Sequence, residues 1–324
     1  MLVETPPLVL LGYSDRRPRL RVVRLGERSV EPAPIELDET GGAIESILLR
    51  EGWLAAEVGQ EVWTIPLPLG KTRGEILTES FDCEPDPDGS SVWVGDRKTP
   101  GTFWRVNGVT QTADAVVEFG AGARLDAVAP AGFVVRRGTE LALVDDRSSE
   151  RGRIGAGHVL ASHGNMILVD ETSGGFALHD LGSGSRTEVE DPGVGRWQAF
   201  PSFSPDGHSV AIGADRDPPK PPPENPDWGN LAPYEGSPSC LVLIDPATGK
   251  ATVAEGSFDN FCYPPVWSND GAWLAFGAPC ESRQLWVMSS EERVLQRVRF
   301  RRQPPMPLLD ATHLPWANPL TEDV

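Results

Sequence analysis

The stretch Phe200-Pro-Ser-Phe-Ser-Pro-Asp-Gly-His-Ser-Val-Ala-Ile-Gly213 recurs without a gap as Pro264-Pro-Val-Trp-Ser-Asn-Asp-Gly-Ala-Trp-Leu-Ala-Phe-Gly277. In both copies an aromatic residue precedes Ser, and Asp-Gly separates two short segments that resemble strands. Asp-Gly predicts a tight hairpin turn here, because glycine accepts the positive φ that such turns require. A hairpin that recurs along a chain indicates a repeat architecture, and this repeat is made of strands.

Weaker copies of the same unit run through the rest of the chain. The turn glycines of six units are Gly52, Gly89, Gly132, Gly164, Gly207 and Gly271. After each turn and its strand comes another short apolar strand, at 62–65, 103–106, 141–144, 176–179, 241–244 and 285–288. A more polar segment then follows. This succession of strand, turn, strand, loop, strand, turn and strand is typical of the four-stranded antiparallel blade of a β-propeller.

A seventh unit is divided between the two ends of the chain. Segments 8–13 and 19–25 have the pattern of second and third strands that lack a first strand, and segment 313–319 matches residues 264–270 but has no continuation. We therefore predict that the C-terminal strand completes the N-terminal blade, which closes the ring and removes exposed sheet edges. The chain would then be one all-β domain over residues 1–324, a seven-bladed β-propeller, with six blades as the alternative.

The sequence motifs at two of these turns resemble the repeats of a known family. Phe203-Ser-Pro-Asp-Gly207 and Trp267-Ser-Asn-Asp-Gly271 resemble the WD-like repeats of TolB-type β-propellers, and segment 285–288 resembles the third strand of those repeats. The resemblance implies a fold that is mostly used to bind proteins, peptides or small ligands. It implies no particular activity, since its residues build turns and packing contacts.

The composition argues against several classes of protein. With 47 acidic and 29 basic residues, the net charge of −18 repels phosphate backbones, so we expect no nucleic-acid partner. No apolar run of membrane-spanning length occurs, so no membrane partner is expected. The N-terminal segment has no basic region and carries Glu4, which argues against a secretory signal and predicts a cytoplasmic protein. Few lysines and many arginines, with abundant Ala, Gly and Pro, suggest a bacterial genome of high GC content.

The cysteines and histidines predict neither a metal nor a cofactor. Cys83, Cys240, Cys262 and Cys280 match no metal-binding spacing and are expected to be free thiols. The five histidines show no H-x-x-x-H or H-E-x-x-H spacing.

Residues 217–238 interrupt the unit of Gly207, which is the sixth when the divided N-terminal unit is counted first, between its second and third strands. The many prolines predict an irregular or polyproline-like loop, because proline cannot donate a hydrogen bond to a sheet. The segment also contains Trp228 and Tyr234, which a purely solvated linker rarely needs. Loops of this length are usually functional or disordered. The sequence leaves open a lid or binding loop and a structurally neutral insertion.

The loops that lead into the first strands should share a face with this insertion. Arg124 and Asp126 lie on this face in the unit of Gly132, which is the fourth by the same count. The other candidate binding residues on this face are Arg196, Trp197, Asp259, Phe261, Tyr263 and His313. Aromatic side chains with convergent polar groups are the usual content of a ligand pocket. The competing interpretation is that Trp197 and Phe261 pack between blades.

The leading hypothesis is a non-catalytic propeller that binds a protein, peptide or small molecule on the insertion face. No G-x-S-x-G nucleophile motif occurs, and no other catalytic motif is recognised. The alternative is an enzyme of the lyase, cyclase or glycan-processing type with its site at the mouth of the channel. In that case Arg196, Asp259 and His313 are the first candidates for acid–base catalysis. A structural subunit of a larger complex is a third possibility.

Overall fold

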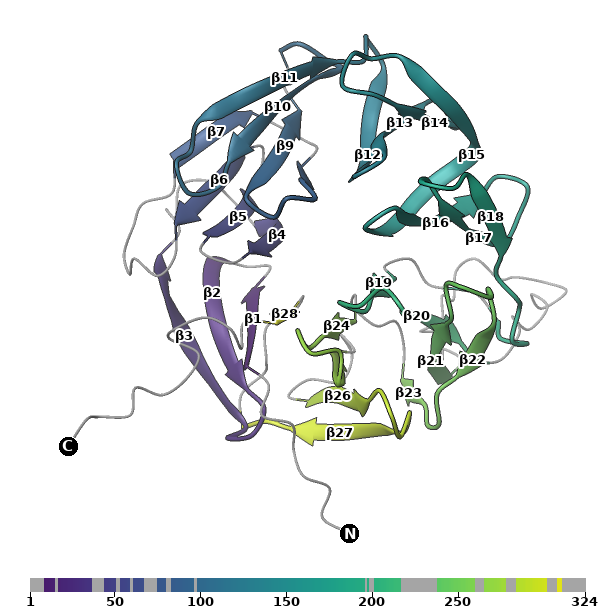
Figure 1. Cartoon of the computed structure of the whole chain (residues 1–324). Helices are drawn as coiled ribbons and strands as arrows, with labels where there is room; N and C mark the ends of the chain where they lie inside the picture. Colours follow the sequence, from purple (N-terminus) through teal and green to yellow (C-terminus); the bar gives the residue numbers. More distant parts are fainter. Residues whose placement is uncertain are drawn as a thin grey trace, which may run out of the picture.

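The structure is a computed structural model in which every described element is a β-strand. It describes residues 9–14, 17–36, 44–50, 53–58, 61–66, 75–79, 83–95, 98–195, 197, 201–216, 238–259, 265–277, 284–301 and 308–310. The strands form several antiparallel sheets that follow one another around a common centre (Figure 1).

Four of the sheets have four strands each. In the first, the order is β28 (Leu308–Asp310), β1 (Val9–Ser14), β2 (Arg17–Arg24) and β3 (Ser29–Glu36). The second contains β4 (Ile44–Arg50), β5 (Trp53–Val58), β6 (Glu61–Pro66) and β7 (Glu75–Glu79) in chain order. The third contains β8 (Cys83–Pro85), β9 (Ser91–Gly95), β10 (Thr102–Asn107) and β11 (Ala113–Glu118). The last contains β24 (Val266–Trp267), β25 (Trp273–Phe276), β26 (Gln284–Ser289) and β27 (Leu295–Arg299).

The two remaining sheets are larger. A seven-stranded sheet contains β12 (Ala123–Ala129), β13 (Gly132–Arg137), β14 (Glu140–Val144), β15 (Glu150–His163), β16 (Met166–Glu171), β17 (Phe176–Asp180) and β18 (Ser185–Glu188). A five-stranded sheet contains β19 (Ser202–Phe203), β20 (Val210–Asp215), β21 (Pro238–Ile244) and β22 (Ala251–Val253), with β23 (Phe258–Asp259) also paired to β21. The 14 residues of β15 pair with β14 over their first half and with β16 over their second half.

The hairpins expected from the repeat are present wherever the structure describes them. Gly207 and Gly271 lie in the turns that join β19 to β20 and β24 to β25, with φ of 72° and 69°. Ser204 and Ser268 stabilise these turns with two hydrogen bonds each. The serine hydroxyl donates one to the turn aspartate, which is Asp206 or Asp270, and accepts the other from a backbone N–H group beyond the turn. Gly52 lies outside the described residues. The six predicted apolar strands correspond to β6, β10, β14, β17, β21 and β26.

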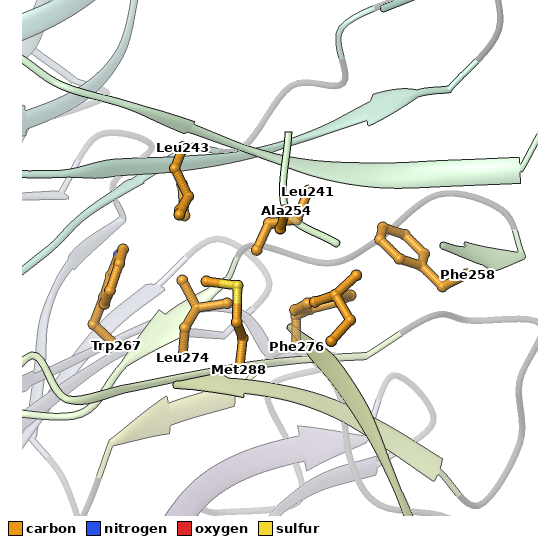
Figure 2. Packing of buried hydrophobic residues seen from close by; sticks show 10 residues of the cluster. Leu241, Leu243, Ala254, Phe258, Trp267, Leu274, Phe276 and Met288 are labelled. Atoms are coloured by element: carbon orange, nitrogen blue, oxygen red, sulfur yellow. The ribbon is translucent and has the colours of Figure 1, made fainter. Parts of the chain in front are cut away.

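Apolar side chains fill the spaces between neighbouring sheets. Figure 2 shows one of these clusters, in which Leu241 and Leu243 of β21 face Leu274, Phe276 and Met288 of β25 and β26. The ring of Trp267 belongs to the same cluster, and its Nε1 donates to the carbonyl oxygen of Ser202 at 3.1 Å. The two faces of one sheet therefore pack on different neighbours, which explains why the second and third strands are apolar on both faces.

A segment near the C-terminus pairs with the N-terminal sheet. Leu308–Asp310 forms three residue pairs with β1, of which Leu10↔Asp310 is one. A buried cluster that includes Leu10, Val23 and Leu285 lies between this sheet and the sheet β24–β27. The sequence-based prediction placed the pairing strand at 313–319, which lies outside the described residues. The observed pairing strand therefore lies earlier in the chain than the segment chosen by similarity to residues 264–270.

Candidate functional site

The two ends of the proline-rich insertion leave the five-stranded sheet side by side. Strand β20 ends at Asp215, and β21 begins at Pro238. Asp215 pairs with Ser239 in the antiparallel register of these two strands. Pro238 was expected to belong to the insertion, but it is the first residue of β21, a position where the missing N–H of proline is tolerated.

A further strand supports the root of the insertion. In β23, Asp259 pairs with Pro238 and Phe258 pairs with Ser239, so this connection runs along the start of β21. Phe258 is buried, and its ring centroid lies 4.9 Å from that of Phe276 and 6.2 Å from that of Trp286. The aromatic contacts anchor β23 in the apolar core, and β23 in turn fixes the first residues that follow the insertion.

The residues that precede the insertion are held in a similar way. The guanidinium of Arg216 donates from Nη1 to the carbonyl oxygen of Gly256 at 3.2 Å. The backbone N–H of Gly195 donates to the carbonyl oxygen of Asp215 at 2.7 Å. Trp197 forms an isolated antiparallel bridge with Ala214. Two segments of the chain therefore hold the root of the insertion, one that contains Gly195 and Trp197 and one that contains Gly256 and β23.

The side chain of Trp197 packs between sheets. Its ring centroid lies 5.1 Å from that of Phe176, with an interplanar angle of 59°. It is partly buried against a cluster that includes Leu178 and Val242. Trp197 therefore packs between sheets, and a binding role for its side chain stays a prediction. Its backbone still contributes to the insertion root, through the bridge to Ala214.

The structure describes two of the eight predicted binding residues, and it places them on opposite sides of the β20–β21 pair. Trp197 and Asp259 lie beside the ends of β20 and β21 that carry the insertion, and Asp259 is placed there by its backbone pairing. The other six, Arg196, Trp228, Tyr234, Phe261, Tyr263 and His313, lie outside the described residues. Sequence reasoning missed Arg216, because a single exposed arginine at the end of a strand carries no distinguishing local pattern.

The inner strand β12 carries the most buried of the ion pairs between an arginine and a carboxylate that the structure describes. Nε of Arg136 lies 2.6 Å from Oδ2 of Asp126, and the two side chains are 17% and 10% exposed. The register of β12 against β13 shifts between Leu125 and Ala127, so Asp126 occupies a bulge. Asp126 and Arg124 were both expected on the ligand face, but Asp126 is neutralised by an arginine from the next strand.

A second ion cluster lies in the sheet β8–β11. Oδ2 of Asp86 accepts hydrogen bonds from Nε1 of Trp93 at 2.8 Å and from Nε of Arg105 at 3.0 Å. Arg105 also pairs with Asp88 and Asp114. Burial opposes the ionised state of Asp88, but hydrogen bonds from Ser90 and the charge of Arg105 hold its pKa below the ordinary value. These groups satisfy one another, so the cluster is a structural cross-link between strands.

Within the described ranges, no three His, Cys, Asp or Glu side chains are grouped so that they could hold a metal ion. The part of the chain that the structure describes contains no helix long and apolar enough to cross a membrane. Cys83 and Cys240 form no disulfide, and the other two cysteines lie outside the described residues.

Comparison of the structure with solved structures shows the fold. The chain is similar to TolB from Acinetobacter baumannii, with a TM-score of 0.51 and 13% identity over 95% of this chain and 68% of that chain. It is similar to Hsv2 from Kluyveromyces lactis, with a TM-score of 0.53 and 12% identity over 76% of this chain and 74% of that chain.

A chain of the mitotic checkpoint complex has a TM-score of 0.53 and 13% identity, with 92% of this chain and 90% of that chain covered. All three are β-propellers, and this chain therefore has a β-propeller fold. No protein-family model matches the sequence, and no curated protein matches it.

Proposed function

We propose that this protein is a cytoplasmic, non-catalytic seven-bladed propeller that binds a protein, peptide or small molecule on the face that carries the insertion. The observation that carries this proposal is that two segments hold the insertion root, one through Gly195 and Trp197 and the other through Gly256 and β23. A long loop whose two ends are rigidly held can present its side chains to a partner at a lower entropic cost than a free linker. The likeness to propellers of low identity supports the fold and leaves the partner open.

The blade number follows from dividing the seven-stranded sheet at β15. The first half of β15 is the fourth strand of a unit with β12–β14, and the second half is the first strand of a unit with β16–β18. The five other sheets each supply one four-stranded unit, with β23 as an extra strand. Strand β28 would then be the first strand of the N-terminal blade and would close the ring. In support, β28 lies beside β24, the first strand of the preceding unit.

Truncation tests the closure. A chain that ends at residue 301 loses β28 and leaves the edge of β1 unpaired, so we expect a lower unfolding midpoint in denaturant and a stronger tendency to aggregate. The matched control ends at residue 312, which keeps β28 but removes the segment 313–319. We expect it to unfold like the full chain. If both truncations are equally damaging, the closing strand is not Leu308–Asp310 alone. If neither is damaging, the ring does not depend on this closure.

Substitution in the insertion tests the binding face. The double variant Trp228→Ala/Tyr234→Ala removes both aromatics of the insertion without touching its root. We expect unchanged thermal unfolding but at least about a tenfold weaker affinity for the partner, since aromatic side chains often dominate binding energy. Partners captured by the wild-type chain would be identified by mass spectrometry, and the dissociation constant of the best one measured with purified proteins.

Trp104→Ala serves as the matched control, because Trp104 is a partly exposed tryptophan of the sheet β8–β11. It should leave the affinity unchanged. Equal affinity of the insertion variant and the wild-type chain would contradict the proposed binding face. A loss of affinity in both variants would place the interface elsewhere on the propeller.

A further inference from the structure

His179 is a buried histidine on β17, the third strand of the unit β15–β18, and its side chain is 9% exposed. It is in register with Ile167 of β16 and with Arg186 of β18, so the three side chains project from the same surface of the sheet. Ile167 belongs to the apolar cluster that also contains Val134 and Leu141 of β13 and β14. His179 therefore lies at the seam between the units β12–β15 and β15–β18.

The imidazole of His179 has an unusual polar environment. Its buried Nε2 lies 3.4 Å from Oε1 of Glu171, but no described group forms a hydrogen bond of normal geometry with this nitrogen. Arg186 donates two hydrogen bonds to the same carboxylate, from Nε to Oε1 at 2.8 Å and from Nη2 to Oε2 at 2.7 Å. Glu171 is therefore already neutralised, and a proton on His179 would place an additional positive charge beside Arg186.

Several other charged side chains of these two units form ion pairs. On the facing unit, Arg136 is bound to Asp126, so neither offers a free counter-charge. Two further pairs form within the unit β12–β15, namely Arg153 with Glu140 and Arg151 with Asp145. On β18, the charge of Glu188 acts on Arg186. A protonated His179 would therefore depend on the single carboxylate that it shares with Arg186.

We propose that His179 makes the seam between the units β12–β15 and β15–β18 sensitive to acid: the neutral imidazole keeps the seam closed, and protonation in mild acid loosens it. This device is independent of the partner proposed above, because it resides in the packing of two sheets rather than in the insertion. A propeller with one such seam would open locally at that seam before the rest of the ring unfolds.

The direction of the effect follows from proton linkage. Burial lowers the pKa of His179 below its ordinary value; the charge of Glu171 opposes this shift and the charge of Arg186 adds to it. The unfolded chain therefore binds the proton more readily than the folded chain. Stability is highest above the ordinary histidine pKa of about 6.5 and falls as the pH decreases from there toward the lower pKa of the folded state. One such group changes the opening constant by up to about tenfold per pH unit.

Hydrogen exchange of the full-length protein at pH 7.5 and pH 5.5 tests this proposal. Exchange rates of amides in β16, β17 and β18 would be divided by their intrinsic rates to obtain the opening constant at each pH. In the wild-type chain we expect this constant to rise by up to about tenfold on acidification. In the His179→Gln variant, the ratio of the opening constant at pH 5.5 to that at pH 7.5 should be smaller than in the wild-type chain by the same factor. The ratio between the two pH values is the readout, since a merely structural role of His179 would change both constants equally.

His158→Gln is the matched control, because His158 is an exposed histidine in the same unit, on β15. It should keep the wild-type ratio. If His179→Gln also keeps the wild-type ratio, the proposal is overturned. Should His179→Gln fail to fold, His179→Asn and an NMR titration of the wild-type imidazole replace it. Protonation of His179 at or above the ordinary histidine range would then refute the proposed device.

Discussion

Trp53→Ala is expected to lower the free energy of unfolding by about 3–5 kcal/mol, the range for truncating a large aromatic side chain in a core. Trp53 is fully buried at the start of β5 and packs in a cluster with Val92 and Val94 of β9. Its Nε1 also donates to the carbonyl oxygen of Gly89 at 3.1 Å. A Cβ atom on Gly108 would lie 2.0 Å from the ring, so the surroundings are fitted closely to this side chain.

Equilibrium unfolding in urea measures this loss. Trp53→Phe keeps most of the apolar volume and should retain a large part of the stability, whereas Trp53→Ala leaves a cavity and an unpaired carbonyl. Trp104→Ala, at a tryptophan that is 37% exposed, is the control and should cost much less. Equal losses for the two alanine variants would show that Trp53 does not contribute the expected packing between the sheets β4–β7 and β8–β11.

Gly101→Ala is expected to cost more than about 3 kcal/mol, because it combines backbone strain with a direct steric overlap. Gly101 has a backbone φ of 87°, which residues other than glycine adopt only with strain. A Cβ atom at this position would also lie 1.9 Å from the carbonyl oxygen of Gly120. The carbonyl oxygen of Gly101 accepts the backbone N–H of Phe119 at 2.8 Å, so neither segment can move away without losing that bond.

Gly120→Ala separates the two contributions. Gly120 has almost the same φ, 88°, but a Cβ atom there would meet nothing within 4 Å. It should therefore show only the conformational cost of about 1–2 kcal/mol. Urea unfolding of both variants gives the comparison. If the two glycines prove equally costly to replace, the close approach of Gly101 to the Gly120 carbonyl does not exist in solution.

Local chemistry made the hairpins and the third strands predictable from sequence. In the turns at Gly207 and Gly271, Ser, Asp and Gly form a complete hydrogen-bonded unit within six residues. The hydrogen bonds from Ser204 and from the backbone N–H of His208 lower the pKa of Asp206, as expected for a carboxylate that caps its own turn. Such units need no distant partner, so their presence could be read from the order of the residues.

Less of the candidate site could be predicted from the sequence. Its position on the insertion face followed from the place of residues 217–238 between two strands. Its supports, however, come from distant parts of the chain: Trp197 reaches Ala214, Arg216 reaches Gly256, and β23 returns to Pro238. A strand paired with β1 was sought by similarity at 313–319, which lies outside the described residues, whereas the structure pairs Leu308–Asp310 with β1. Pairing of a short strand depends on the available edge, and similarity between two segments does not identify that edge.

By itself, the sequence determined that this protein consists of short antiparallel strands joined by Asp-Gly and related turns, because those features depend on neighbours along the chain. Only the tertiary structure decided which distant groups meet: the supports of the insertion root, the Arg136–Asp126 pair, and the contacts of Glu171 with the buried His179 and the exposed Arg186. Side chains from separate strands acquire their burial and their partners when the sheets pack together. Their protonation and their contribution to stability are therefore properties of the folded protein, which no local pattern encodes.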